Sequence, residues 1–224
     1  MGLTISTFTP DSIVLGTDSL AEIKNNDDGF YQTDNEKIFI ISGRYAVAIE
    51  NCAFYNGLPI SAYITDGNIC NWHGRNVEDL AQYLCSQFSL LFPGEDIMAY
   101  VAGYDSEDCK YLPRVFLIHD QRIDCINRQE EGKHVYNFHA IGRTHWINKL
   151  LMNTETSING EVLQFKDYDI DFSKYSTQFA RKFVKHMLRL SEEMDRFSQL
   201  KPSIGGQYEI VTIRPNQNIT LEIL

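Results

Sequence analysis

Residues 3–19 read LTISTFTPDSIVLGTDS, a pattern that predicts a β-hairpin. Apolar and polar side chains alternate from Leu3 to Phe8, and β-branched residues are frequent, as is typical of a strand. Pro10-Asp11 supplies the turn, and residues 12–18 supply the returning strand. We therefore expect two antiparallel strands here, the second of which ends at the acidic residue Asp18.

Two further strands are predicted next along the chain. They read KIFII at residues 37–41 and YAVAI at residues 45–49, and Ser42-Gly43-Arg44 joins them. An Asn/Asp-rich loop at residues 25–28 separates this pair from the first hairpin. We interpret the first fifty residues as one antiparallel meander.

Helical spacing of apolar residues is found in three places. It predicts an amphipathic helix over residues 76–92 with Asn76 as its N-cap, a helix beginning near Thr144, and the longest helix from about Ser173 to Phe197. Further strands are predicted at residues 59–64, 97–102, 115–119, 124–127, 207–214 and 219–223. Runs of strands separated by helices favour an α+β architecture of antiparallel sheets over alternating parallel units.

Composition narrows the class of protein and its partners. The chain has 224 residues, 43% of them hydrophobic, and no linker-like stretch, which favours a single domain over residues 1–224. Its net charge is −10, so nucleic acid and anionic membranes are not expected as partners. Residues 1–6 lack the pattern of a signal peptide, and no run is apolar for the roughly 18 residues of a membrane span.

Cysteine and histidine spacing argues against disulfides and metals. The five cysteines contain no CxxC pair, so we expect reduced thiols in a cytoplasmic protein. Four histidines lie in or near the second group of predicted strands, namely His119, His134, His139 and His145. They show no HxH or HxxxH spacing, and neither a metal nor a cofactor is expected.

Four ordered patches carry a resemblance to a known family. They are DSIVLGTDS (residues 11–19), KIFII with YAVAIEN (37–41 and 45–51), HAIGRTHWINKLL (139–151) and SIGGQYEIVTI (203–213). Together they resemble the proteasome β-subunit and its bacterial HslV relatives, which are N-terminal nucleophile (Ntn) hydrolases. The resemblance implies an α+β fold of the Ntn-hydrolase type, a four-layer αββα sandwich with two antiparallel sheets.

The family's chemistry assigns roles to individual positions. An N-terminal threonine attacks an amide carbonyl with its own amine as base, while an aspartate and a lysine support it and a backbone N–H stabilises the oxyanion. By resemblance Asp18 and Lys37 take the acidic and lysine positions, and the backbone of Asn51 takes the oxyanion position. The nucleophile position falls on Gly2, which has no side chain. Thr4 is the alternative nucleophile, but its use requires removal of residues 1–3 and shifts the amine by about 7 Å.

Other positions also depart from the family pattern. Glu50 precedes Asn51 where the family has alanine-glycine, Lys201 and Ile204 stand where a supporting acid and serine are expected, and Arg143 replaces a turn serine. Residues 52–74 are too short for the family's first long helix.

Two functions remain open on this sequence. The first is a proteasome-subunit-like protein without threonine peptidase activity, which acts as a structural or binding module and self-associates, for example in a ring. In this case Asp18 and Lys37 form a structural ion pair. The alternative is an active peptidase or amidase after N-terminal processing, with peptide or protein substrates.

Overall fold

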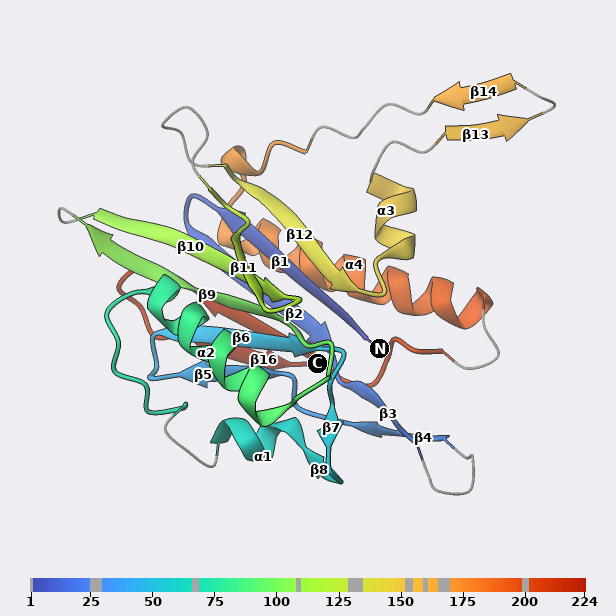
Figure 1. Cartoon of the computed structure of the whole chain (residues 1–224). Coiled ribbons are helices and arrows are strands. Elements are labelled where there is room, and N and C mark those ends of the chain that lie inside the picture. The colour runs from blue at the N-terminus through green and yellow to red at the C-terminus, as the bar shows by residue number, and fades with distance from the viewer. Residues whose placement is uncertain are drawn as a thin grey trace.

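The computed structural model describes residues 2–24, 30–65, 69–107, 110–128, 135–151, 155–158, 161–164, 170–198 and 202–224. The main strands form two five-stranded antiparallel sheets (Figure 1). The first sheet has the order β12 (Asn137–Gly142), β1 (Leu3–Thr9), β2 (Ser12–Asp18), β15 (Tyr208–Ile213) and β16 (Thr220–Ile223). The second has the order β11 (Arg122–Cys125), β10 (Lys110–His119), β9 (Met98–Glu107), β6 (Tyr45–Glu50) and β5 (Ile38–Ile41).

The predicted opening hairpin is confirmed, but the meander is wrong. β1 and β2 pair with Thr4 opposite Thr17, and both strands are buried along their whole length. β5 and β6 also pair with each other, but they belong to the second sheet. Along the chain between β2 and β5 there is a separate hairpin, β3 (Leu20–Lys24) and β4 (Phe30–Asp34), where an Asn/Asp-rich loop was expected.

Three apolar clusters hold these elements together. The inner faces of the two sheets contact each other through side chains that include Phe8 and Leu15 from the first sheet and Ala46 and Tyr100 from the second. The outer face of the second sheet packs on α2 (Val77–Leu91), and the outer face of the first packs on α4 (Thr177–Ser198). No described helix is long and apolar enough to cross a membrane.

Gly16 allows α4 to approach β2 closely. A Cβ atom at Gly16 would lie 2.2 Å from Val184 Cγ1, inside the van der Waals distance. Val184 is itself fully buried on the face of α4 that packs on the first sheet. The glycine in the middle of β2 is therefore a packing requirement.

The observed starts of the helices agree in part with the starts predicted from the sequence. The Asn76 side chain accepts a hydrogen bond from the Asp79 backbone N at 2.7 Å, which confirms the predicted N-cap. α3 (His145–Leu151) begins close to the predicted start at Thr144. The longest helix begins at Thr177, because residues 172–174 form a separate 3₁₀ turn, η1 (Phe172–Lys174).

The strand predicted at residues 59–64 is wrong. The chain there forms two short strands, β7 (Phe54–Tyr55) and β8 (Leu58–Pro59), followed by α1 (Ile60–Thr65). Ile60 and Ile64 are the buried residues of α1, and their spacing of four places them on one helical face. Periodicity over such a short apolar run does not distinguish a strand from a helix.

The predicted Ntn-hydrolase αββα sandwich is also wrong, because the described chain is rich in antiparallel strands and poor in helices. Two helices are long, α2 and α4, so each sheet is covered by one long helix rather than by a helical layer. α1 and α3 contain only six and seven residues. Short hairpins take up further chain: β7–β8 precedes α2, and β13 (Glu155–Ile158) with β14 (Glu161–Gln164) lies between α2 and α4 in the sequence (Figure 1).

Candidate functional site

Asp18, Lys37 and Glu50 form a buried ion cluster. Asp18 is the last residue of β2, Lys37 directly precedes β5, and Glu50 is the last residue of β6. Lys37 Nζ lies 3.2 Å from Asp18 Oδ1 and 3.6 Å from Glu50 Oε1. All three side chains are at most 5% exposed. The structure thus brings together the predicted Asp18 and Lys37, and adds Glu50 as a second carboxylate.

The cluster connects the two sheets. Asp18 belongs to the first sheet, whereas Lys37 and Glu50 lie at the end of strands of the second. Nearby, the Glu209 carboxylate of β15 accepts hydrogen bonds from the backbone N of Lys37 at 3.1 Å and of Ile38 at 3.0 Å. Ion pairs and hydrogen bonds therefore join the sheets at this end of the molecule.

The Asp18 carboxylate is held by three donors. In addition to Lys37, it accepts from the backbone N of Leu3 at 2.7 Å and of Gly205 at 3.0 Å. Burial raises the pKa of Asp18 to about 6, and the Lys37 charge only partly offsets this effect. Burial acts to lower the pKa of Lys37, but Glu50 and Asp18 outweigh it and hold that pKa above its ordinary value.

The raised pKa of Asp18 predicts a pH-dependent stability term. Between an unfolded pKa of 3.8 and a folded pKa of about 6, the folded state retains a proton that the unfolded state has released. Stability contributed by this group therefore falls as the pH rises through that window. We expect the carbon-13 NMR signal of the Asp18 carboxyl to titrate near pH 6, and the stability advantage of the wild type over Asp18→Asn to shrink from pH 4 to pH 6. A titration midpoint below 4 would contradict this prediction.

Gly2 lies against this cluster, and a side chain at this position would require the neighbouring charged side chains to move. Its backbone N lies 3.2 Å from Glu50 Oε2 and donates to it. A Cβ atom at Gly2 would lie 2.2 Å from Lys37 Nζ and 2.3 Å from Asp18 Oδ1. The ion pair therefore occupies the position from which a nucleophilic side chain would start.

Thr4 is buried in the middle of the first sheet. Its Cα is paired with Thr17 of β2 and Ile141 of β12, and its side chain is not exposed. Thr4 Oγ1 donates to Glu50 Oε1 at 2.8 Å. Use of Thr4 as an N-terminal nucleophile would remove Leu3, a fully buried core residue. Its hydroxyl serves here as a donor to a buried carboxylate.

Asn51 follows Glu50 in a left-handed backbone conformation with φ of 70°. Its side-chain Nδ2 lies 3.4 Å from Asp96 Oδ2. Asn51, Gly2 and Lys37 help to line a cavity of about 60 Å³. This is far below the roughly 300–1,000 Å³ of a typical ligand site. The Glu50 carboxylate on the same cavity would repel a developing oxyanion instead of stabilising it.

Sequence reasoning missed Asp195, which anchors the loop before the double glycine. Asp195 is 1% exposed, and its Oδ2 accepts from the backbone N of Ser203 at 2.5 Å and of Ile204 at 3.3 Å. The same loop delivers the Gly205 N–H to Asp18. The available signal was an acidic residue four positions after Ser191 on the buried stripe of α4.

Three positions at which the sequence differs from the resembled family are Arg143, Ile204 and Lys201, and the structure describes the first two. Arg143 Nη1 lies 3.5 Å from Asp195 Oδ1, so the arginine at the turn position supports the same loop. Ile204 is buried in the core under α4. The prediction for Lys201 falls outside the described residues.

The histidines are used in separate contacts. His139 Nδ1 lies 2.6 Å from the Tyr100 hydroxyl, and His119 Nε2 lies 2.7 Å from Asp124 Oδ2. His134 lies outside the described residues. Within the described ranges, no group of three or more His, Cys, Asp and Glu side chains is arranged to hold a metal ion.

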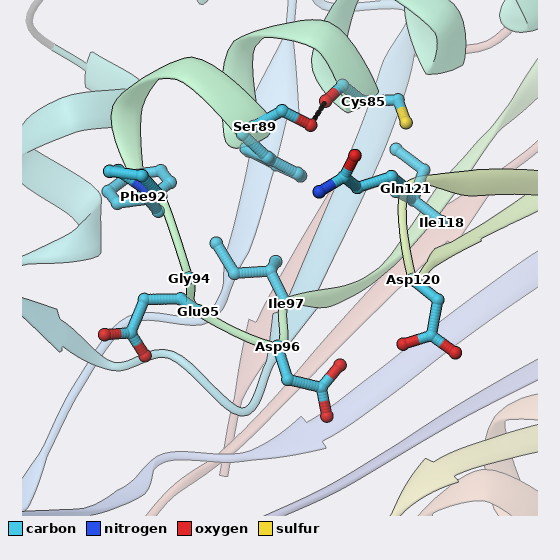
Figure 2. A pocket seen from close by; sticks show the side chains of 12 residues that line it. Cys85, Ser89, Phe92, Gly94, Glu95, Asp96, Ile97, Ile118, Asp120 and Gln121 are labelled. Atoms are coloured by element: carbon cyan, nitrogen blue, oxygen red, sulfur yellow. Dashed lines mark hydrogen bonds between the residues drawn. The ribbon is translucent and has the colours of Figure 1, made fainter.

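Larger hollows exist elsewhere on the surface. One, of about 520 Å³, lies between the end of α2 and the β10–β11 turn, and Figure 2 shows Phe92, Ile97, Asp120 and Gln121 around it. It contains none of the cluster residues Gly2, Asp18, Lys37 or Glu50.

Comparison with known proteins adds no family assignment. No model of a known protein family matches the chain, and no curated protein sequence matches it.

Proposed function

We propose that the chain is a proteasome-subunit-like protein without threonine peptidase activity, which acts as a structural or binding module. In this proposal the Asp18–Lys37–Glu50 cluster joins the two sheets and does not carry out amide hydrolysis. The proposal rests on the residues of the site, because a fold by itself does not determine an activity.

The observation that carries the proposal is the environment of Gly2. Its side-chain position is filled by Lys37 Nζ and Asp18 Oδ1, at 2.2 and 2.3 Å from where a Cβ would lie. In a threonine peptidase the lysine supports the nucleophile by placing positive charge beside it. Here the Lys37 ammonium is paired with two carboxylates, and no hydroxyl nucleophile stands at Gly2 for it to activate.

Glu50 supports the same conclusion. Its carboxylate binds the Gly2 backbone N at 3.2 Å and the Thr4 hydroxyl at 2.8 Å. Both groups that could serve in an N-terminal mechanism are thus hydrogen-bonded to a negative charge. Catalysis of amide hydrolysis requires stabilisation of negative charge on the substrate oxygen, which a neighbouring carboxylate opposes.

A peptidase assay tests the proposal. Purified full-length protein is incubated with fluorogenic peptides that carry apolar, basic or acidic residues before the cleaved bond, with an authentic threonine peptidase as positive control. We expect no hydrolysis above the level of the Lys37→Ala variant. Turnover by the wild type that is lost in Lys37→Ala would overturn the proposal, and mass spectrometry of the same sample would show whether the chain then begins at Thr4.

A cytoplasmic location is part of this proposal. Cys52, Cys70, Cys85 and Cys125 are free thiols, which suits a reducing compartment.

A further inference from the structure

A second hollow of about 520 Å³ lies beside the start of α2, over residues of β9, β10 and β11. Phe116 of β10 and Cys125 of β11 belong to the face of the second sheet that packs on α2. Arg114 precedes Phe116 by two residues on the same strand, so it lies on the same face. The volume is within the roughly 300–1,000 Å³ of small-molecule sites. None of the residues of the ion cluster lines this hollow.

Arginine gives this hollow an excess of positive charge. Arg75, Arg114 and Arg128 line it, against the carboxylates of Glu78 and Asp105. The chain as a whole carries a net charge of −10, and the hollow at the other end of α2 (Figure 2) is lined by three carboxylates and by no basic residue. The charge here is therefore opposite in sign to that of the whole protein, which favours an anionic ligand.

Arg114 is held in the hollow by contacts within the protein. Its Nε lies 3.7 Å from Asp105 Oδ2, and its side chain is 23% exposed. The other oxygen of the same carboxylate, Asp105 Oδ1, accepts a hydrogen bond from the backbone N of Val77 at 2.9 Å. Burial raises the pKa of the Cys125 thiol, and the Arg114 guanidinium acts to lower it, which places this cation beside the thiol.

The other two guanidinium groups have no carboxylate partner. Arg75 and Arg128 are exposed, and neither forms an ion pair with any residue that the structure describes. The Asp105 carboxylate is already used by Arg114 and Val77. Cations that line one hollow repel each other, and an anion between them would replace this repulsion by attraction.

We propose that this hollow binds a small phosphomonoester with an apolar body, whose phosphoryl group is held by Arg75, Arg114 and Arg128. A phosphoryl group carries a charge of about −1.5 to −2 and three acceptor oxygens, so it can engage several guanidinium groups at once. Phe116 and Cys125 supply an apolar wall for the rest of the ligand. The net charge of −10 opposes nucleic acids and anionic membranes as the source of the phosphate.

NMR titration of the nitrogen-15-labelled full-length protein with phenyl phosphate tests this inference. We expect saturable shifts of the backbone amide signals of Phe116 and Cys125. Phenol lacks the phosphoryl group and inorganic phosphate lacks the apolar body, so each should bind at least about tenfold more weakly at the same ionic strength. Phenol or inorganic phosphate that binds as tightly as phenyl phosphate would overturn the inference, as would the absence of a saturable shift with phenyl phosphate.

A pair of double variants tests the role of the arginines. Arg75→Gln/Arg128→Gln should weaken the binding of phenyl phosphate at least about tenfold, because charge-assisted hydrogen bonds are lost. Arg122→Gln/Arg189→Gln is the matched control, since it removes two exposed arginines outside the hollow, and should bind like the wild type. Equal affinities of the two double variants would overturn the inference, and the NMR spectra show that each is folded.

This site and the inactive ion cluster fail independently. The peptidase assay reports on the cluster, and the titration reports on the hollow. An active peptidase that binds phenyl phosphate would overturn the proposed function alone, whereas an inactive protein that does not bind it would overturn only the phosphate site.

Discussion

Replacement of Lys37 by Met is expected to lower the free energy of unfolding by about 3–5 kcal/mol, because the change leaves buried carboxylates without their cation. Asp18 and Glu50 are at most 1% exposed at their side chains, and Lys37 is the ammonium within 4 Å of both. Methionine keeps most of the side-chain length, so the loss reports charge more than packing. Urea unfolding at pH 7 and pH 4 measures the effect. The loss of stability should be smaller at pH 4, because the Asp18 carboxyl, whose pKa is raised, is then protonated and needs no cation.

Two variants sharpen this result. Lys174→Met removes a lysine that is 77% exposed and paired with Asp171, and should cost less than about 1 kcal/mol. Adding Glu50→Gln to Lys37→Met removes one of the two uncompensated charges and should restore part of the lost stability. A Lys37→Met protein as stable as the Lys174→Met control would show that the cluster does not stabilise the fold.

Replacement of Asp195 by Ala is expected to have an effect of similar size, about 3–5 kcal/mol, because it orphans several buried donors at once. The Asp195 carboxylate accepts from the backbone N of Ser203 and of Ile204 and from the Ser203 hydroxyl. An unsatisfied buried donor costs about 1–3 kcal/mol, and partial relaxation of the loop keeps the total below the sum.

Hydrogen exchange shows whether the damage reaches the ion cluster. Gly205 belongs to the loop that Asp195 anchors, and its backbone N–H donates to Asp18 Oδ2 at 3.0 Å. The protection of the Gly205 amide from hydrogen exchange should therefore fall in Asp195→Ala. Asp171→Ala, which alters a partly exposed carboxylate next to Lys174, serves as control and should leave this amide protected. Unchanged protection of the Gly205 amide in Asp195→Ala would show that the Asp195 contacts are not needed for the hydrogen bond between Gly205 and Asp18.

Variants of Lys37 and Asp195 also separate a structural role of these residues from a catalytic one. If Lys37 and Asp195 stabilise the fold, their variants lose stability, whereas hydrolysis is absent in the wild type and in the variants alike. A pair of variants that kept full stability but lost hydrolysis would instead indicate a working catalytic site.

Short-range signals in the sequence determined several elements, and the family resemblance indicated two members of the site. Alternation and turn residues gave the β1–β2 hairpin, and apolar spacing with Asn76 as cap gave α2. Asp18 and Lys37 were assigned to one site by the family resemblance, and the structure places their charged groups 3.2 Å apart. The hairpin and the helix depend on residues close together in the chain, which periodicity can detect.

Tertiary contacts decided the rest. The assignment of β1–β2 and β5–β6 to different sheets depends on which apolar faces meet across the interior, and local alternation is the same in both arrangements. The helical layers implied by the resemblance are not formed, because each sheet is covered by one long helix, α2 or α4, and α1 and α3 contain only six and seven residues.

The character of the site also required the structure. The sequence showed that Gly2 lacks a side chain, but only the fold places Lys37 Nζ and Asp18 Oδ1 where that side chain would stand. It also turns Glu50 toward Gly2 and Thr4, and brings Asp195 to the loop that reaches Asp18. The sequence by itself determined which charged residues lie at strand ends. The packing of the two sheets determined that these residues meet in a buried cluster, because the contacts there join distant parts of the chain, such as Asp18 and Gly205, which are 187 positions apart.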